Sequence, residues 1–391
     1  MKDGAELKKL HISTQLSMLG RNPEEQSGFV NAPVYRGSTV VYRNCDDLRH
    51  KKAKFAYGTA GTPTIANLEN AWTALCNAAG TVISSSGLGA LALALFAATK
   101  SGDHILVTDS VYRPLRNFCD SVLQKYGVTT TYYDPLAGAQ IESLIKEHTR
   151  VILLESPGSQ SFEVQDIGAI VAVAKRHGIS TIIDNTWATP IFFQAHALGI
   201  DLSVEAATKY LGGHSDLLMG MVSANASHWP ALRATYDAMA MLPGAEDCFL
   251  ALRGLRIMHL RVKEAEARGL EMARWLKAQP EVSRVLHPAF AECPGHENWK
   301  KYFSGSTGLF SVVLNERFTQ ENVDNMLNNM DIFGLGFSWG GFESLIIPFD
   351  CTEYRTATAW APQGMTLRLQ IGLEDIDDLK NDLQAGLQRL W

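Results

Sequence analysis

A lysine shortly before a pair of glycines is the first stretch of this sequence that could carry out chemistry. The apolar run 201–207 precedes Lys209, and Thr208 stands between the run and the lysine. The glycine pair 212–213 follows, and it continues neither a strand nor a helix comfortably. We expect a turn that holds the amine against apolar walls, where its charged form is disfavoured and it can form a Schiff base with a carbonyl. The alternative is an ordinary solvated lysine.

A carboxylate precedes this lysine, at the end of a β-branched run. Residues 180–183 predict a strand, and Asp184 follows it directly. Open α/β folds bind ligands at the carboxyl ends of their strands, so Asp184 is expected at such a site. Pyridoxal phosphate (PLP) needs both groups, a lysine for its aldehyde and a carboxylate that keeps its pyridine nitrogen protonated. The alternative is that Asp184 and Asn185 form only a turn or a helix cap.

A glycine-containing segment, 84–90, follows a short predicted strand and opens a predicted helix. The free backbone N–H groups of Gly87 and Leu88 are expected to bind the cofactor phosphate there. Thr208 is expected to add a hydroxyl from the lysine side. A dinucleotide site is the rival interpretation, but the third glycine of that fingerprint is missing.

The motifs at 180–187 and 207–216 resemble those of the Cys/Met-metabolism group of PLP enzymes, and the resemblance runs nearly end to end. It implies an α/β enzyme of fold type I, with a large domain whose mostly parallel central sheet is flanked by helices, and a smaller C-terminal α/β domain. It also implies a carbon–sulfur β-lyase that cleaves L-cystathionine to homocysteine, pyruvate and ammonia in methionine biosynthesis. A cystine or cysteine-conjugate β-lyase, a γ-lyase and a sulfhydrylase are alternatives on the same scaffold.

The resemblance also assigns roles to residues outside these motifs. It implies that Tyr112 stacks on the pyridine ring, and that Tyr57 reaches the active site of a neighbouring subunit. Arg368 would clasp the substrate α-carboxylate, a task that suits its planar fork. The expected residues are Lys209, Tyr112 and Asp184 for catalysis; Lys209, Gly87, Leu88, Tyr112, Asp184, Thr208 and Tyr57 for the cofactor; and Arg368, Ser338, Trp339 and Tyr57 for the substrate.

Two positions bear on which family member this is. The β-lyases resemble this chain in carrying a tryptophan, here Trp339, beside the serine, whereas members that act at Cγ commonly have a small or aliphatic residue there. Thr59 departs from the family, which usually has an arginine at this place that reaches the neighbouring subunit's phosphate. Arg113 and Lys54 are the candidates for a replacement cation, and Ala206 removes one further contact that a serine supplies in many members.

Strand-like runs alternate with helical stretches between residues 64 and 183, which is typical of βαβ units and a mostly parallel sheet. A long helix is expected at about 247–278. The predicted divisions are an N-terminal arm, 1–60, with strand-like pieces at 34–42, that reaches the partner subunit; a PLP-binding large domain, 61–253; and a C-terminal small domain, 254–391.

The amino-acid composition limits the kinds of molecule that this protein is expected to bind. A net charge of −6 leaves no basic excess for nucleic acid, and 46% apolar with 19% charged residues is ordinary for a globular protein. Six scattered cysteines predict reduced thiols and no metal site. No signal peptide and no apolar run of ~20 residues is found, so we expect a cytoplasmic homo-oligomer, dimer or tetramer, that acts on a small sulfur amino acid away from membranes. A nicotinamide-binding protein or a catalytically silent binding module are the rival classes.

Overall fold

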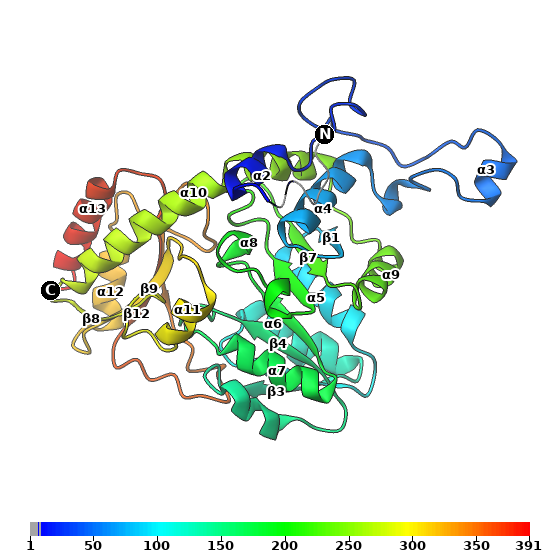
Figure 1. Ribbon diagram of the computed structural model, residues 1–391. Helices are drawn as coiled ribbons and strands as arrows, with labels where there is room; N and C mark the ends of the chain where they lie inside the picture. Colours follow the sequence, from blue (N-terminus) through cyan, green and yellow to red (C-terminus); the bar gives the residue numbers. More distant parts are fainter. Residues whose placement is uncertain (1–6, 8) are drawn as a thin grey trace.

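The computed structural model describes residue 7 and residues 9–391, and the chain folds around two β-sheets. A helix of 33 residues, α10 (Ala245–Lys277), packs against the larger sheet's helices at one end and against the smaller sheet at the other (Figure 1). The predicted division between residues 253 and 254 falls inside this helix, and we retain it as a proposal.

The larger sheet has seven strands in the order β1-β7-β6-β5-β4-β2-β3, and only β7 runs antiparallel to its neighbours. The prediction of a mostly parallel sheet is therefore confirmed. The strands are β1 (Gly80–Ser84), β2 (His104–Thr108), β3 (Thr129–Tyr133), β4 (Thr149–Glu155), β5 (Ser180–Asp184), β6 (Leu202–Glu205) and β7 (Gly220–Ala224).

Both faces of this sheet are buried. Side chains along the central strands alternate between two hydrophobic cores, one on each face. In β4, Val151 and Leu153 lie in one core and Ile152 and Leu154 in the other. Strands covered on both faces need continuous apolar runs, which explains the pattern of this sequence. One face is covered by α4 (Pro63–Leu75), α7 (Ile167–His177), α8 (Thr189–Phe192) and part of α10, and the other by α5 (Gly87–Ala98), α6 (Arg113–Phe118), the π-helical turn η2 (Cys119–Leu123) and α9 (Trp229–Met239).

The smaller sheet has five strands in the order β10-β11-β12-β9-β8, with antiparallel pairs except between β10 and β11. Its core is shared with the end of α10 and with the last helices of the chain. The elements are β8 (Val282–Leu286), α11 (His296–Tyr302), β9 (Leu309–Leu314), α12 (Gln320–Leu327), β10 (Gly334–Leu335), β11 (Leu345–Phe349), β12 (Thr366–Gln370) and α13 (Ile376–Gln388), and the short 3-10 helices elsewhere are η1 (Gly58–Ala60), η3 (Gly138–Leu144) and η4 (His196–Leu198).

The N-terminal segment projects from the body as an extended arm that carries α3 (Cys45–Arg49) (Figure 1). The prediction of strand-like pieces at 34–42 is wrong, since this segment joins no sheet. The helix α2 (Ile12–Met18) was not predicted. Part of the predicted arm, residues 1–6 and 8, lies outside the described residues. Phe29 is 73% exposed and Val41 is 88% exposed on the arm. Apolar side chains this exposed on an extended segment are typical of an interaction surface.

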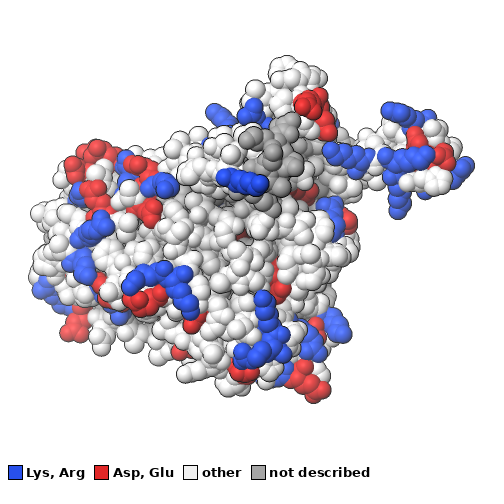
Figure 2. All heavy atoms as spheres, viewed as in Figure 1, with Lys and Arg blue, Asp and Glu red and all other residues white. Residues whose placement is uncertain are grey.

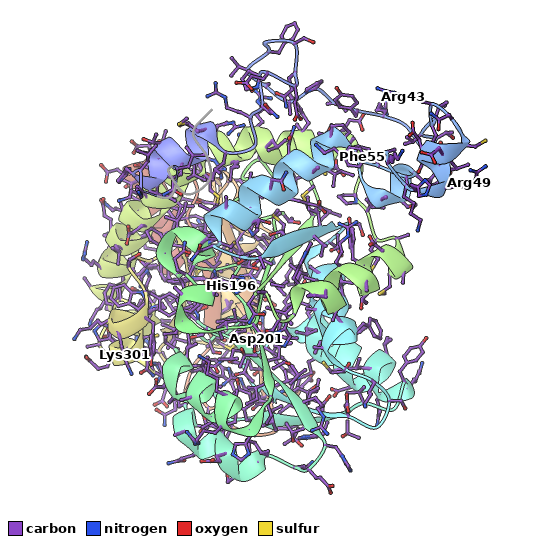
Figure 3. All side chains as sticks on the ribbon, turned by 45° about the vertical axis from the view of Figure 1, so that its right-hand side comes forward. Arg43, Arg49, Phe55, His196, Asp201 and Lys301 are labelled. Atoms are coloured by element: carbon purple, nitrogen blue, oxygen red, sulfur yellow. The ribbon has the colours of Figure 1, made fainter. Side chains whose placement is uncertain are left out.

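Charged side chains are distributed over the surface, and several Lys and Arg side chains gather at the projecting end of the arm (Figure 2). Arg43 and Arg49 lie there, far from His196 and Asp201 in the body of the protein (Figure 3). No helix of the described residues is long and apolar enough to cross a membrane. Across the same residues, no group of three His, Cys, Asp or Glu side chains could hold a metal ion.

Candidate active site

Lys209 lies on a turn directly after β6. Its backbone N–H donates to Ala206 O at 3.0 Å, and its carbonyl accepts from Gly213 N at 2.8 Å. Gly213 has a φ of 71°, a conformation that favours glycine, and Arg261 of α10 donates to Tyr210 O at 2.7 Å from the side where a Cβ would stand. The glycine and the arginine together fix the backbone that carries Lys209.

The amine of Lys209 is largely shielded from water. Its Nζ donates to Ser338 Oγ at 2.7 Å and lies 5.3 Å from the centre of the Trp339 ring. Burial lowers the pKa of Lys209 from 10.5 to about 8, and the nearby Arg368 adds to this effect, while Asp184 opposes it. At pH 7 about a tenth of the amine is therefore uncharged, which is the form that a nucleophile or general base requires.

Asp184 ends β5 at the carboxyl edge of the large sheet, where the sequence predicts it. Burial raises the pKa of this carboxyl, while the N–H and hydroxyl of Thr186 and the charge of Lys209 oppose the rise. The Thr186 hydroxyl donates to Asp184 Oδ1 at 2.5 Å and accepts from Ala206 N at 2.8 Å. Thr186 thus ties the end of β5 to the turn of Lys209, a role that our sequence reasoning missed.

Glu155 is a second carboxylate that we missed. It ends β4, and its register partner in β5 is Asp184. Its Oε2 accepts from Tyr112 N at 2.7 Å, which fixes the backbone of the tyrosine. Burial and the neighbouring Asp184 raise the pKa of Glu155 well above its usual value. The rule that located Asp184, a carboxylate directly after a buried strand, would have located Glu155 as well.

Tyr112 caps the start of α6 and stands 42% exposed at the same edge. Burial raises its pKa, the charges of Glu155 and Asp184 raise it further, and Arg368 lowers it. The phenol therefore stays protonated near neutral pH and can donate a proton. The charges of Asp184 and Arg368 therefore both act on this phenol.

The start of α5 offers two free backbone donors. Ser86 Oγ accepts from Gly89 N at 3.0 Å and Ser86 O accepts from Ala90 N at 3.0 Å, which leaves the N–H groups of Gly87 and Leu88 for a ligand. A Cβ on Gly87 would lie 2.6 Å from Ala206 Cβ, so this helix start packs directly against the turn of Lys209.

The Thr208 hydroxyl lies on the other side of the same turn. It donates to Met219 O at 3.3 Å and accepts from Met219 N at 3.0 Å, so it already supports the backbone of a neighbouring segment. Its expected contact with a phosphate stays a prediction.

Arg368 points into the site from β12 of the small sheet. It is only 8% exposed. Its NH2 donates to Ser338 O at 3.1 Å, and Ser338 has a φ of 86°, an uncommon conformation for a serine. Ser338 therefore contacts Lys209 through its hydroxyl and Arg368 through its carbonyl. Burial lowers the pKa of Arg368 to about 10, so it remains charged at neutral pH.

Tyr57 is half-exposed on the arm, next to Thr59 in η1. Among the described residues, no hydrogen bond or ring contact joins Tyr57 to the site around Lys209. Of the two candidate replacement cations, Lys54 lies 3.9 Å from Glu25 Oε2, and Arg113 stacks on the ring of Tyr354.

These residues fit PLP. The lowered pKa of Lys209 suits it for the aldehyde, the shielded Asp184 suits the pyridine nitrogen, and the helix start at Gly87 suits the phosphate. The glycine at position 87 lets Ala206 pack against the start of α5, which brings this helix start and the turn of Lys209 together.

Comparison with known proteins identifies the family of this chain. A family model described as Cys/Met metabolism PLP-dependent enzyme matches residues 13–388. A Saccharomyces cerevisiae protein named "Putative cystathionine beta-lyase" is 62% identical over 87% of this chain and 100% of its own. Cystathionine beta-lyase MetC of Escherichia coli is 40% identical over 97% of this chain and 98% of its own. The crystal structure of metB from Corynebacterium glutamicum superimposes with a TM-score of 0.91 at 28% identity, covering 98% of this chain and all of that one.

Proposed function

Because the chain belongs to the Cys/Met metabolism family of PLP-dependent enzymes, we propose that it is a carbon–sulfur β-lyase that cleaves L-cystathionine. The products are homocysteine, pyruvate and ammonia, as in methionine biosynthesis. The observation that carries this proposal is the position of Ser338, which joins the amine of Lys209 to the guanidinium of Arg368 beside the Trp339 ring. The names of the yeast and E. coli relatives support it.

PLP, when bound, supplies an electron sink for the negative charge that loss of the Cα proton leaves on the substrate. The residues that hold it in this proposal are Lys209, Asp184, Tyr112, Gly87, Leu88, Thr208 and, from a neighbouring subunit, Tyr57. The buried Asp184 keeps the pyridine nitrogen protonated, and Thr186 holds that carboxylate in place.

Two groups of the chain handle protons. Lys209 removes the Cα proton, since its pKa of about 8 leaves part of the amine uncharged at neutral pH. The leaving sulfur takes up a proton from Lys209 or from Tyr112. Because burial and nearby carboxylates raise the pKa of the Tyr112 phenol, it holds its proton until the sulfur departs.

Arg368 binds the α-carboxylate of the substrate. Its buried guanidinium keeps one N–H on Ser338 O and has further donors for a bidentate contact. The same serine holds Lys209 Nζ, so the proton acceptor and the carboxylate anchor share one support.

We expect pyruvate and homocysteine as the dominant products from L-cystathionine. Trp339 packs at 5.6 Å from the Tyr210 ring, and its indole beside Lys209 limits the room for a second proton abstraction at Cβ, which γ-chemistry requires. Purified enzyme with PLP is incubated with L-cystathionine, and pyruvate and 2-oxobutyrate are measured separately. Dominant 2-oxobutyrate with cysteine would make it a γ-lyase and overturn the proposal.

The exposed N-terminal arm supports a proposal about how the subunits assemble. Phe29, Val41 and Tyr57 are exposed on a segment that has no core of its own, and such a segment is stabilised by contact with another chain. We infer that a second subunit receives the arm, so that the active enzyme is at least a dimer, with a tetramer as the expected assembly. A cytoplasmic location remains part of the proposal.

Thr59→Arg should tighten PLP binding by about tenfold. A charge-assisted hydrogen bond contributes roughly 1.5–3 kcal/mol where one is added to a phosphate, and Thr59 supplies no charge at the place where the family usually has arginine. Binding is measured by titrating apoenzyme with PLP. Thr59→Gln, which adds length without charge, is the control, and equal affinities of the two variants would show that another cation already serves the phosphate.

A further inference from the structure

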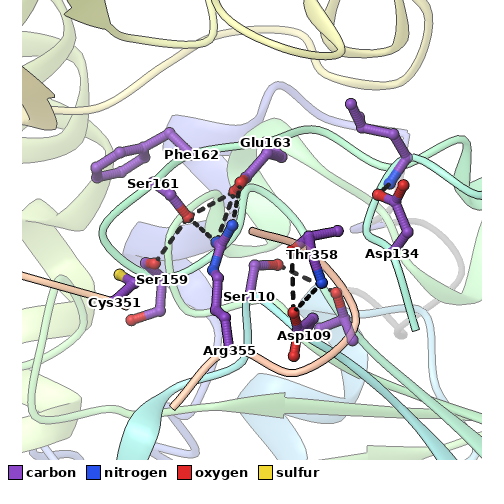
Figure 4. A network of polar contacts seen from close by, with 12 residues as sticks. Asp109, Ser110, Asp134, Ser159, Ser161, Phe162, Glu163, Cys351, Arg355 and Thr358 are labelled. Carbon is purple, nitrogen blue, oxygen red and sulfur yellow. Dashed lines mark hydrogen bonds and ion pairs between the residues drawn. The ribbon is translucent and has the colours of Figure 1, made fainter. Parts of the chain in front are cut away.

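The loop between β11 and β12 is held against the large sheet by a buried carboxylate. Asp109, which follows β2, accepts from the N–H groups of Thr356, Ala357 and Thr358 at 3.0, 3.0 and 2.8 Å (Figure 4). Arg116 contacts the same carboxylate, and the Asp109 side chain is fully buried. Burial alone would raise the pKa of Asp109, but these donors outweigh it and lower the pKa. Three consecutive N–H groups on one carboxylate fix the loop backbone.

A second buried ion pair holds the same loop at the preceding residue, Arg355. Arg355 NH1 lies 2.7 Å from Glu163 Oε1, and its side chain is 3% exposed (Figure 4). Ser161 Oγ donates to Glu163 Oε2 at 2.5 Å and also contacts Arg355. Two buried charged contacts within four residues make the loop a fixed part of the rim between the two sheets.

This fixed loop presents Tyr354, and the guanidinium of Arg113 lies 5.1 Å from the centre of its ring. The Tyr354 hydroxyl donates to Cys351 Sγ at 2.9 Å. Arg113 is exposed and has no ion pair with any residue in the described part of the chain. Stacking on an aromatic ring orients a guanidinium while leaving its N–H donors free.

Arg113 is also close in sequence to a residue of the candidate site. It follows Tyr112 directly, and Tyr112 is coupled electrostatically to Arg368. The loop of Tyr354 enters β12 at Thr366, two residues before Arg368, a separation of about 6.7 Å along a strand. Two arginines thus differ in burial: Arg368 is buried beside Ser338, and Arg113, next to Tyr112 in sequence, is exposed and stacked on Tyr354.

We propose that Arg113, held on Tyr354, binds a carboxylate carried by the leaving thiol and so selects L-cysteine thioethers with an anionic S-substituent. This inference rests on the proposed β-lyase activity, because it names which thioethers that activity prefers. A forked guanidinium matches a carboxylate in bidentate fashion, and the uncharged Thr59 and Ala60 offer no competing cation from the arm.

The test uses two thioethers of the same size that differ in charge, S-(2-carboxyethyl)-L-cysteine and S-(2-carbamoylethyl)-L-cysteine. Pyruvate formation gives kcat/KM for each. We expect the wild-type enzyme to prefer the carboxylate about tenfold, and Arg113→Met to reduce this preference to near one. Tyr354→Ala should lower the preference in part, since the guanidinium loses its support, and Tyr354→Phe should retain it.

Arg317→Met is the matched control, because Arg317 is another exposed arginine stacked on an aromatic ring, 3.8 Å from the centre of the Trp391 ring. It should keep the wild-type preference. An Arg113→Met enzyme with unchanged preference overturns this inference and leaves the β-lyase proposal intact. Weaker PLP binding by Arg113→Met apoenzyme with unchanged preference would assign the arginine to the phosphate instead. Absence of pyruvate from both thioethers, with pyruvate still formed from L-cystathionine, would overturn this inference alone, and absence of pyruvate from L-cystathionine as well would overturn the β-lyase proposal.

Discussion

Lys209→Ala should lower kcat/KM for L-cystathionine by roughly 10³-fold or more. The variant loses both the amine that attaches PLP and the base that removes the Cα proton, and the base alone contributes about 10²- to 10⁴-fold. No second lysine can replace it easily, because Ser338 Oγ and the Trp339 ring hold the amine in one place.

Attachment is measured separately from turnover. After borohydride reduction of wild-type enzyme with PLP and peptide mapping, we expect the pyridoxyl group on Lys209. Lys301→Ala is the control, since Lys301 is an exposed lysine 3.5 Å from Asp166 Oδ1, and it should leave labelling and turnover unchanged. A pyridoxyl group on any other lysine would contradict the assignment of the whole site.

Those parts of the site that follow strand ends could be predicted from the sequence. Asp184 at the end of β5 and Lys209 shortly after β6 were located because parallel strands bring their carboxyl ends to one edge of a sheet. The strand predicted at 180–183 lies within β5 (Ser180–Asp184), since a short β-branched run between turn residues has few alternatives. The same rule would also have located Glu155, to which we did not apply it.

Contacts between residues distant in sequence could not be predicted. Thr186 joins Asp184 to Ala206, and Asp109 holds residues 356–358. Both contacts form only because the folded chain brings together segments that are distant in sequence. Polar residues of these types occur in many loops, so neither composition nor periodicity distinguishes them. Strand β11 was also missed, since Pro348 interrupts its pattern and points away from a strand assignment.

In the N-terminal arm the sequence predicts strands that the structure does not contain. Residues 34–42 have β-branched and aromatic side chains, yet they form no strand, because strand propensity reflects packing on a sheet and the arm finds none within its own chain. Its base is nevertheless fixed: Thr64 Oγ1 accepts from Tyr35 N at 2.9 Å and donates to Pro33 O at 2.8 Å.

Asp184→Ala should retain PLP and lose most turnover, with kcat reduced by roughly 10²-fold or more. The remaining anchors, Lys209 and the start of α5 at Gly87, still hold the cofactor, so binding survives. Without the buried carboxylate the pyridine nitrogen loses its proton, and the ring no longer accepts the charge left at Cα. Single-turnover release of pyruvate gives the rate of the chemical step, and titration of apoenzyme gives the affinity for PLP.

Asp184→Asn separates charge from shape in this prediction. The amide keeps an oxygen that can accept from the Thr186 hydroxyl and N–H, which bond Asp184 Oδ1 at 2.5 and 3.0 Å, so the end of β5 should stay in place. It cannot carry the negative charge that stabilises a protonated pyridine nitrogen. We therefore expect Asn to be as slow as Ala in turnover while matching the wild type in thermal stability. An Asn variant with near wild-type turnover would mean that Asp184 supports the backbone at this sheet edge and that the nitrogen needs no counter-charge from it.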